Sequence, residues 1–403
     1  MTDLKLRFSR GSLGTTAFLG SFSSLSLLNP QATVFGTGFL VPNDIANPDL
    51  TWHTNTETNY GINLGFLENR FTLGVDYYTS DIEDILINQS VSEVLGTTSI
   101  VLNSGDVRSS GLEFEVGANI INTPNLRWTV NANLSTVDTE ITDLGGLDEL
   151  PQVQYGQSGR GPIFRNYVGG EIGEMWGLET IGEVEIQFLE DPTRHPNNTT
   201  GESYVVDQNG DGVITTDVFD PENPSAGGDL VKIGQNTPDF YWGLNTQLAF
   251  NDFDVSLQFQ GAEGAEVYNI DPLYYGSEWS GRLIDDFGTD GIANVGPNAG
   301  EHFIGNRRQT DSGIQDASYL ALRNLTIGYT LSPDVISKAG LGSLRVYVAS
   351  TNLLYLFGDD YTSYNPEGIE ITNGGYLGPT TSGVQVGATP VQRSFTFGVN
   401  LNF

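Results

Sequence analysis

The chain has 403 residues, no cysteine and a formal net charge of -33, with 50 glycines and 11% aromatic residues. The lack of cysteine excludes a disulfide framework and thiolate metal sites, and the acidic balance argues against nucleic-acid binding, which needs a basic surface. No run of about 18 apolar residues is present to form a transmembrane helix, whereas glycine, aromatic and β-branched residues favour strands and turns.

Alternation of apolar and polar residues predicts strands along most of the chain. Short turns at 67–70, 122–125 and 251–252 are expected to join some of them into hairpins. The expected strands number about eleven: residues 4–8, 60–65, 71–78, 111–120, 126–134, about 168–181, 241–250, 252–260, 322–331, 344–355 and 393–403.

The connections between hairpins are long and acidic, unlike the short turns within them. Connections of this length are unusual in compact soluble domains, but outer-membrane barrels combine short periplasmic turns with long extracellular loops. An odd strand count leaves both sheet edges unpaired, so the fold class predicted is all-β, a partial antiparallel transmembrane β-barrel. The long connections cover about 79–107, 136–165, 182–238, 262–317 and 357–391.

The last segment has the clearest alternation. Phe395, Phe397, Val399, Leu401 and Phe403 share one face, and small polar residues share the other. A barrel strand presents this pattern to lipid and lumen. A soluble sandwich strand also alternates, although it is usually shorter and carries charges on its outer face.

No residue pattern typical of an enzyme is present. The three histidines, His53, His195 and His302, lack metal-ligand spacing, and no catalytic or phosphate-binding motif appears with the required structural context. The many acidic residues are interpreted as solvated loops, with divalent-cation sites or a saline habitat as alternatives. The prediction is a protein that is not an enzyme and has no cofactor other than calcium.

A calcium loop is the one candidate metal site. Asp207, Asn209 and Asp211 occupy positions 1, 3 and 5 of an EF-hand-type loop, Val213 offers a carbonyl at position 7, and Thr215 stands at position 9. Calcium prefers six to eight oxygen ligands of these kinds. Position 12 is valine rather than an acidic residue, with Asp217 or Asp220 as candidate substitutes. A structural turn built on Asn-Gly and Asp-Gly remains the alternative.

Several stretches taken together resemble the SusC/RagA group of TonB-dependent outer-membrane transporters. Their order and spacing carry the resemblance, which spans nearly the whole chain. They include 47–52 (NPDLTW), 103–113 (NSGDVRSSGLE), 207–214 (DQNGDGVI), 319–329 (YLALRNLTIGY), 351–354 (TNLL), 365–367 (NPE) and 393–403 (RSFTFGVNLNF).

The resemblance implies a 22-stranded barrel, about half of which would be formed by residues 1–403. It also implies an outer-membrane location among lipids, import of oligosaccharides or peptides, a SusD-like surface lipoprotein as partner, and TonB coupling through a plug domain. A plug domain and a signal peptide are expected to be absent from this chain. Phe403, with Leu401 and Phe395, resembles the signal that the barrel-assembly machinery reads. The alternative is that Phe403 only completes an apolar strand face.

A different class of function is the alternative to transport. A secreted or surface all-β module that binds or adheres in a calcium-dependent way also fits alternating strands and acidic loops. Such a module needs a second layer over the apolar strand faces and closed sheet edges.

Overall fold

The structure is a computed structural model that describes most of the strand regions and parts of the connections. The described residues are 1–16, 19, 22–26, 28–31, 39–42, 45–92, 99–150, 163–179, 206–211, 215, 217–269, 310–336, 340–358, 361–368, 383–385 and 388–402.

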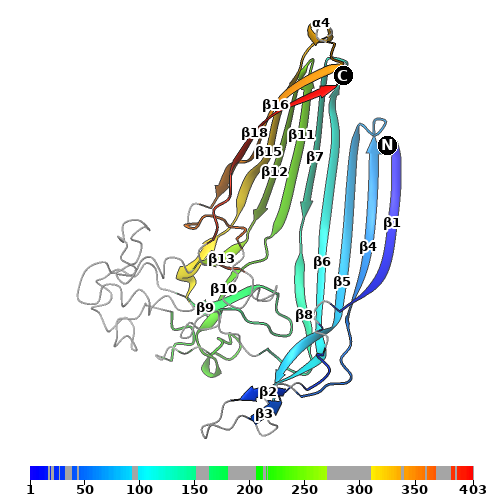
Figure 1. The fold of residues 1–403 in the computed structure, drawn as a ribbon. Coiled ribbons are helices and arrows are strands. Elements are labelled where there is room, and N and C mark those ends of the chain that lie inside the picture. Colours follow the sequence, from blue (N-terminus) through cyan, green and yellow to red (C-terminus); the bar gives the residue numbers. More distant parts are fainter. Residues whose placement is uncertain are drawn as a thin grey trace, which may run out of the picture.

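One large antiparallel sheet dominates the described part of the chain. It holds eleven strands, ten of them in a continuous path from β1 to β18, with β8 paired to β6 off the path. Figure 1 shows the long strands side by side in this order. They are β1 (Asp3–Thr15), β4 (His53–Phe66), β5 (Phe71–Ser90), β6 (Ser99–Asn122), β7 (Leu126–Ser135), β8 (Asp138–Leu144), β11 (Phe240–Phe250), β12 (Phe253–Glu263), β15 (Tyr319–Thr330), β16 (Ser343–Phe357) and β18 (Ser394–Asn402).

Three small sheets lie beyond the ends of these strands. One pairs β2 (Leu28–Gln31) with β3 (Phe39–Pro42), and another pairs β9 (Glu174–Leu178) with β10 (Leu230–Gln235). The third joins β13 (Glu266–Asn269), β14 (Ile314–Asp316) and β17 (Val384–Gln385). Helical structure is limited to short pieces, and none in the described ranges has the length and apolarity needed to cross a membrane. They are α4 (Pro333–Ile336) and the 3-10 turns Pro224–Ala226 and Asp311–Gly313.

The two ends of the sheet differ in their connections. At the end called here the turn end, β4–β5, β6–β7 and β11–β12 are joined by tight turns, as predicted. Leu67, Glu68 and Asn69 adopt φ of 51°, 57° and 61°, and Asn251 adopts 52°. Asparagine tolerates this left-handed region better than most residues. Both chain termini lie toward the turn end, and the short strands β9, β10 and β13 of the long connections lie at the opposite end, called here the loop end (Figure 1).

The faces of the main sheet differ in chemistry. Successive residues of a strand point to opposite sides, and the cross-strand register lines up apolar residues on one side. That apolar face has no covering layer in the described part of the chain, since Phe397 is 79% and Leu6 73% exposed. One of its rows contains Val116, Ala132, Leu244, Phe259, Leu322 and Leu354.

The buried core of the main sheet lies at its loop end. Ile87 of β5 packs with Ile141 and Leu144 of β8, which pairs with β6. A second cluster of Ala262, Tyr319 and Ala321 lies at the loop end of β12 and β15. The long sheet therefore lacks a conventional core of its own over most of its length.

Two sequence predictions need correction. The segment 79–107 was expected to be a loop, but β5 runs to Ser90 and β6 begins at Ser99. The period-2 pattern is lost first in the polar run 79–81 and then at bulges on both sides of Ile85, with Asp84 at φ 63°. The strand expected at about 168–181 is β9, which pairs with β10 instead of the main sheet, and β8 is the eleventh strand.

Candidate functional site

The polar face of the main sheet carries two adjacent rows of uncharged side chains. Asn324 donates a hydrogen bond to Gln258 within the first row, at 2.6 Å. Amide and hydroxyl groups both donate and accept hydrogen bonds, so this surface suits contact with polar, uncharged groups. We call it the amide belt. The rows are Asn131, Asn245, Gln258 and Asn324, and Thr129, Gln247, Ser256 and Thr326.

Two ion pairs on the polar face each cross over a glycine. Arg7 of β1 reaches Asp76 of β5 at 2.6 Å, and Gly61 of the intervening β4 lies beneath them. A Cβ atom at Gly61 would meet both side chains. Glycine is therefore required there because a long side chain from each outer strand must pass over the strand between them.

The second such pair lies at the turn end of β12, β15 and β16. Arg345 makes two hydrogen bonds to Asp254, at 2.5 and 2.9 Å, and both side chains lie over Gly328. The bidentate geometry is the stronger form of an arginine–carboxylate pair.

A third charged cluster lies at the loop end of the same strands. Arg323 of β15 pairs with Glu367, which also accepts hydrogen bonds from the hydroxyls of Tyr319, at 2.5 Å, and Tyr355, at 2.7 Å. The two tyrosine rings stack with centroids 5.4 Å apart, and the guanidinium lies 5.6 and 5.5 Å from them. We call Tyr319, Arg323, Tyr355 and Glu367 the latch.

A β-bulge places Arg323 in the latch. The register of β12 with β15 skips Arg323, so Arg323 and Asn324 do not follow the simple alternation. The facing strand β16 is also irregular there, and Asn352 adopts φ 50° and accepts a hydrogen bond from Arg323 at 3.3 Å. Bulges re-aim side chains in this way, and here the bulge turns an arginine to the polar face.

The electrostatics of the latch favour an ionised Glu367. Burial alone would raise the pKa of Glu367, but hydrogen bonds from Arg323, Tyr319 and Tyr355 outweigh it and hold the pKa below its usual range. The carboxylate is therefore charged at neutral pH, as the ion pair with Arg323 requires.

The turn that carries Glu367 is also held from its other side. The buried Gln385 of β17 directs its amide nitrogen to the carbonyls of Asn365, Pro366 and Gly368, at 3.0–3.2 Å. Tyr361 donates a hydrogen bond to Gln385 at 2.6 Å. The Asn-Pro-Glu turn thus connects β15 of the main sheet to the three-stranded sheet of β13, β14 and β17. We call this small sheet the platform.

The structure places part of the predicted calcium loop. Asp207 accepts a hydrogen bond from the amide of Gly210 at 2.7 Å, and Asn209 accepts one from Asp211 at 3.0 Å. Thr215 is described, whereas Val213 lies outside the described residues. Within the described ranges, no group of three or more His, Cys, Asp or Glu residues is arranged to hold a metal ion.

Asp229 is the residue of this loop that sequence reasoning missed. It is fully buried, and its two carboxylate oxygens accept hydrogen bonds from the amides of Gln208 at 2.8 Å and Thr215 at 2.7 Å. It lies 22 positions after Asp207, outside the window of a 12-residue calcium loop. Its fixed contact with the loop makes it the first acidic residue to test there.

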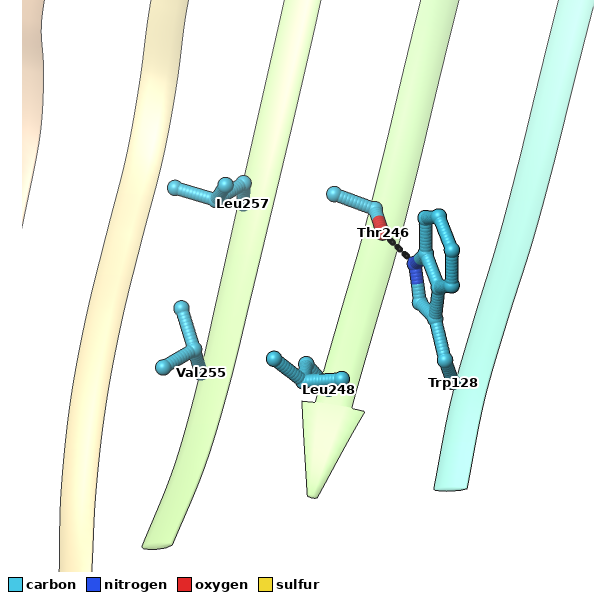
Figure 2. A pocket seen from close by; sticks show the side chains of 5 residues that line it. All are labelled: Trp128, Thr246, Leu248, Val255 and Leu257. Atoms are coloured by element: carbon cyan, nitrogen blue, oxygen red, sulfur yellow. Dashed lines mark hydrogen bonds between the residues drawn. The ribbon is translucent and has the colours of Figure 1, made fainter. Parts of the chain in front are cut away.

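The apolar face contains an open groove across β7, β11 and β12 (Figure 2). The indole nitrogen of Trp128 donates a hydrogen bond to the Thr246 hydroxyl at 2.9 Å, so the two polar groups satisfy each other. The remaining lining residues, Leu248, Val255 and Leu257, are apolar. This chemistry fits contact with hydrocarbon.

Two of the three residues of the predicted assembly signal lie on the same face. Phe395 and Leu401 of β18 are 60% and 46% exposed, while Phe403 lies outside the described residues. Their role in assembly stays a prediction.

An open antiparallel sheet with one apolar and one polar face, tight turns at one end and long connections at the other is the wall of a transmembrane-type β-barrel. Residues 4–156 match the family model described as TonB dependent receptor-like, beta-barrel. The chain is 28% identical over its whole length to TonB-dependent receptor P3 of Formosa agariphila, covering 40% of that protein. It is 24% identical to TonB-dependent receptor SusC of Bacteroides thetaiotaomicron, covering 38% of it.

A solved structure, that of the RagAB peptide transporter, has the same fold over the whole chain. The TM-score is 0.73 at 19% identity, and the match covers 41% of that structure's chain. The chain thus has the barrel fold of the TonB-dependent receptors and resembles their SusC/RagA group, as the sequence predicted. It spans about 40% of the length of the curated relatives that it matches.

Proposed function

We propose that the chain forms part of the barrel wall of a TonB-dependent outer-membrane importer of the SusC/RagA type. The observation that carries the proposal is the division of one wide sheet into an uncovered apolar face and a polar face. In a barrel, these faces contact lipid and lumen respectively. The family consists of transport receptors rather than enzymes, and we propose the same for this chain.

The chemistry of the polar face favours a polar substrate. The amide belt offers donors and acceptors without net charge across four neighbouring strands, which suits oligosaccharides or the backbone of peptides. We propose these two classes as substrates of the whole importer.

The partners are proposed on the same basis. They are outer-membrane lipids at the apolar face, a SusD-like lipoprotein at the loop end, the barrel-assembly machinery, and TonB acting through a plug domain of the whole protein. The outer membrane is the proposed location.

Import by the full-length protein in its own cell tests this function. A strain without the protein is expected to lose energy-dependent uptake of at least one labelled oligosaccharide or peptide, and the wild-type gene is expected to restore it. A protonophore should abolish the restored uptake, because TonB coupling needs the proton gradient of the inner membrane. Restored uptake that persists without that gradient would contradict the proposal.

We also propose that the loop around Asp207 binds calcium. The supporting observations are the spacing of Asp207, Asn209 and Asp211 and the buried Asp229 beside them. Calorimetric titration of the full-length protein is expected to detect a calcium site that Asp211→Ala weakens at least tenfold. Glu222→Ala is the control, since Glu222 is exposed and lies outside this motif. Absence of binding below millimolar calcium would leave the loop as a structural turn.

The adhesion-module alternative is not favoured. It requires a second layer over the apolar residues, and in the described part of the chain they are uncovered. The match of residues 4–156 to a receptor barrel also supports transport over adhesion.

A further inference from the structure

The platform joins the barrel wall through two short, adjacent junctions. Gly264 and Ala265 separate β12 from β13, and Ala317 and Ser318 separate β14 from β15. Gly264 has φ 80°, and its amide donates a hydrogen bond to the Ser318 hydroxyl at 2.9 Å. The two junctions lie side by side, because the amide of Ala317 donates a hydrogen bond to the carbonyl of Ala265 at 2.8 Å, and both alanines are buried.

The third platform strand reaches the wall by another route. β17 enters from the long connection after β16 and pairs in parallel with β13. Its Gln385 holds the carbonyls of the turn at 365–368, and Glu367 of that turn is held by Arg323 of β15. This chain of contacts ties the platform to the wall at Arg323, five residues along the chain from Ser318.

We infer that the latch fixes the angle of the platform to the barrel wall, and that Arg323 and Glu367 are positioning residues for import. Tyr361 packs with Val267 of the platform in a buried cluster, and its ring centroid lies 5.2 Å from that of Phe357 of β16. The latch adds a charge-assisted attachment to these contacts. The side chains of Arg323 and Glu367 keep 18% and 31% exposure, so the attachment is accessible to solvent rather than sealed in a core. The role in import rests on the proposed function, but the mechanical role does not.

The matched test compares two carboxylate-to-amide changes in the full-length protein. Glu367→Gln breaks the latch, and Asp254→Asn breaks the other ion pair on the same three strands at the turn end. Hydrogen exchange, followed by mass spectrometry, reports on the amides of β13, β14 and β17. We expect exchange there to be at least about tenfold faster in Glu367→Gln, because a charge-assisted pair is lost, and unchanged in Asp254→Asn. Equal exchange rates in Glu367→Gln and wild type would overturn the inference.

Uptake of the substrate identified for the wild type gives the second readout. Glu367→Gln is expected to raise the KM severalfold at unchanged outer-membrane level and maximal rate, because the platform no longer holds one position at the lumen mouth. Faster exchange with an unchanged KM would overturn the role in import and keep the mechanical one. If the wild type itself imports nothing, the proposed function is contradicted, and the hydrogen-exchange comparison still tests the mechanical role of the latch.

Discussion

Leu257→Arg in the full-length protein is expected to abolish insertion into the outer membrane. Leu257 lies mid-strand on the apolar face of β12, in the groove of Figure 2. An arginine on the lipid face of a barrel costs about 2–4 kcal/mol near the bilayer midplane. A guanidinium at this position has no charged partner in its row, where Thr246 and Leu325 are its direct neighbours. Membrane fractionation and heat-modifiable gel migration measure the outcome.

The neighbouring residue provides a matched control. Ser256 precedes Leu257 on the same strand but points to the polar face, between Gln247 and Thr326. Ser256→Arg adds the same charge at nearly the same depth, and we expect insertion close to wild type. Equal loss of insertion in both variants would show that the two faces of the strand do not contact lipid and lumen respectively. That result would contradict the proposed barrel wall.

The faces of the sheet were predictable because they follow from local alternation alone. In β18, for example, the apolar face can be recognised from the alternation of that strand alone. The register then places Phe395, Phe397, Val399 and Leu401 opposite Ser350, Val348, Val346 and Leu344 of β16. The tight turns were predictable for the same reason, since their length and residue types are local features. Neither inference needed a contact between distant parts of the chain.

Strand boundaries near bulges were not predictable by the same rule. The alternation in β5 is already lost in the polar run 79–81, and Asp84, with φ 63°, then shifts the register with β6. Counting by twos then places the strand end too early. The bulge at Arg323 has the same effect, because it brings two consecutive polar residues to one face, and the strand predicted to begin at 322 begins at Tyr319.

The latch depends on a contact 44 positions apart in sequence. Arg323 and Glu367 each lay within a stretch that resembles the SusC/RagA group, yet no local pattern pairs them. An arginine within an otherwise apolar strand was the available signal, because a charge in a wall strand needs a partner. The sequence does not say which of 50 acidic residues supplies it.

Asp229 illustrates the same limit and leads to the second large expected effect. The calcium-loop pattern directs attention to the twelfth position, which is Val218, while the acidic residue that contacts the loop follows eleven positions later. Two backbone hydrogen bonds place Asp229 beside the loop. The amide of Leu230 donates to the carbonyl of Asp217 at 3.0 Å, and the amide of Phe219 donates to the carbonyl of Leu230 at 2.9 Å. The carboxylate is then buried against the loop backbone.

Asp229→Ala is expected to destabilise the 206–211 loop by roughly 2–4 kcal/mol, because two buried amides lose a charged acceptor together. Asp229→Asn should cost about half as much, since its amide keeps one acceptor oxygen for the donors of Gln208 and Thr215. Asp220→Ala, at an exposed position with one local hydrogen bond, should change little. Hydrogen exchange of peptides covering 206–211 measures all three in the full-length protein. If Asp229 holds the loop through both oxygens, exchange should increase most in Asp229→Ala, less in Asp229→Asn and least in Asp220→Ala. Equal exchange rates in Asp229→Ala and Asp220→Ala would contradict that role.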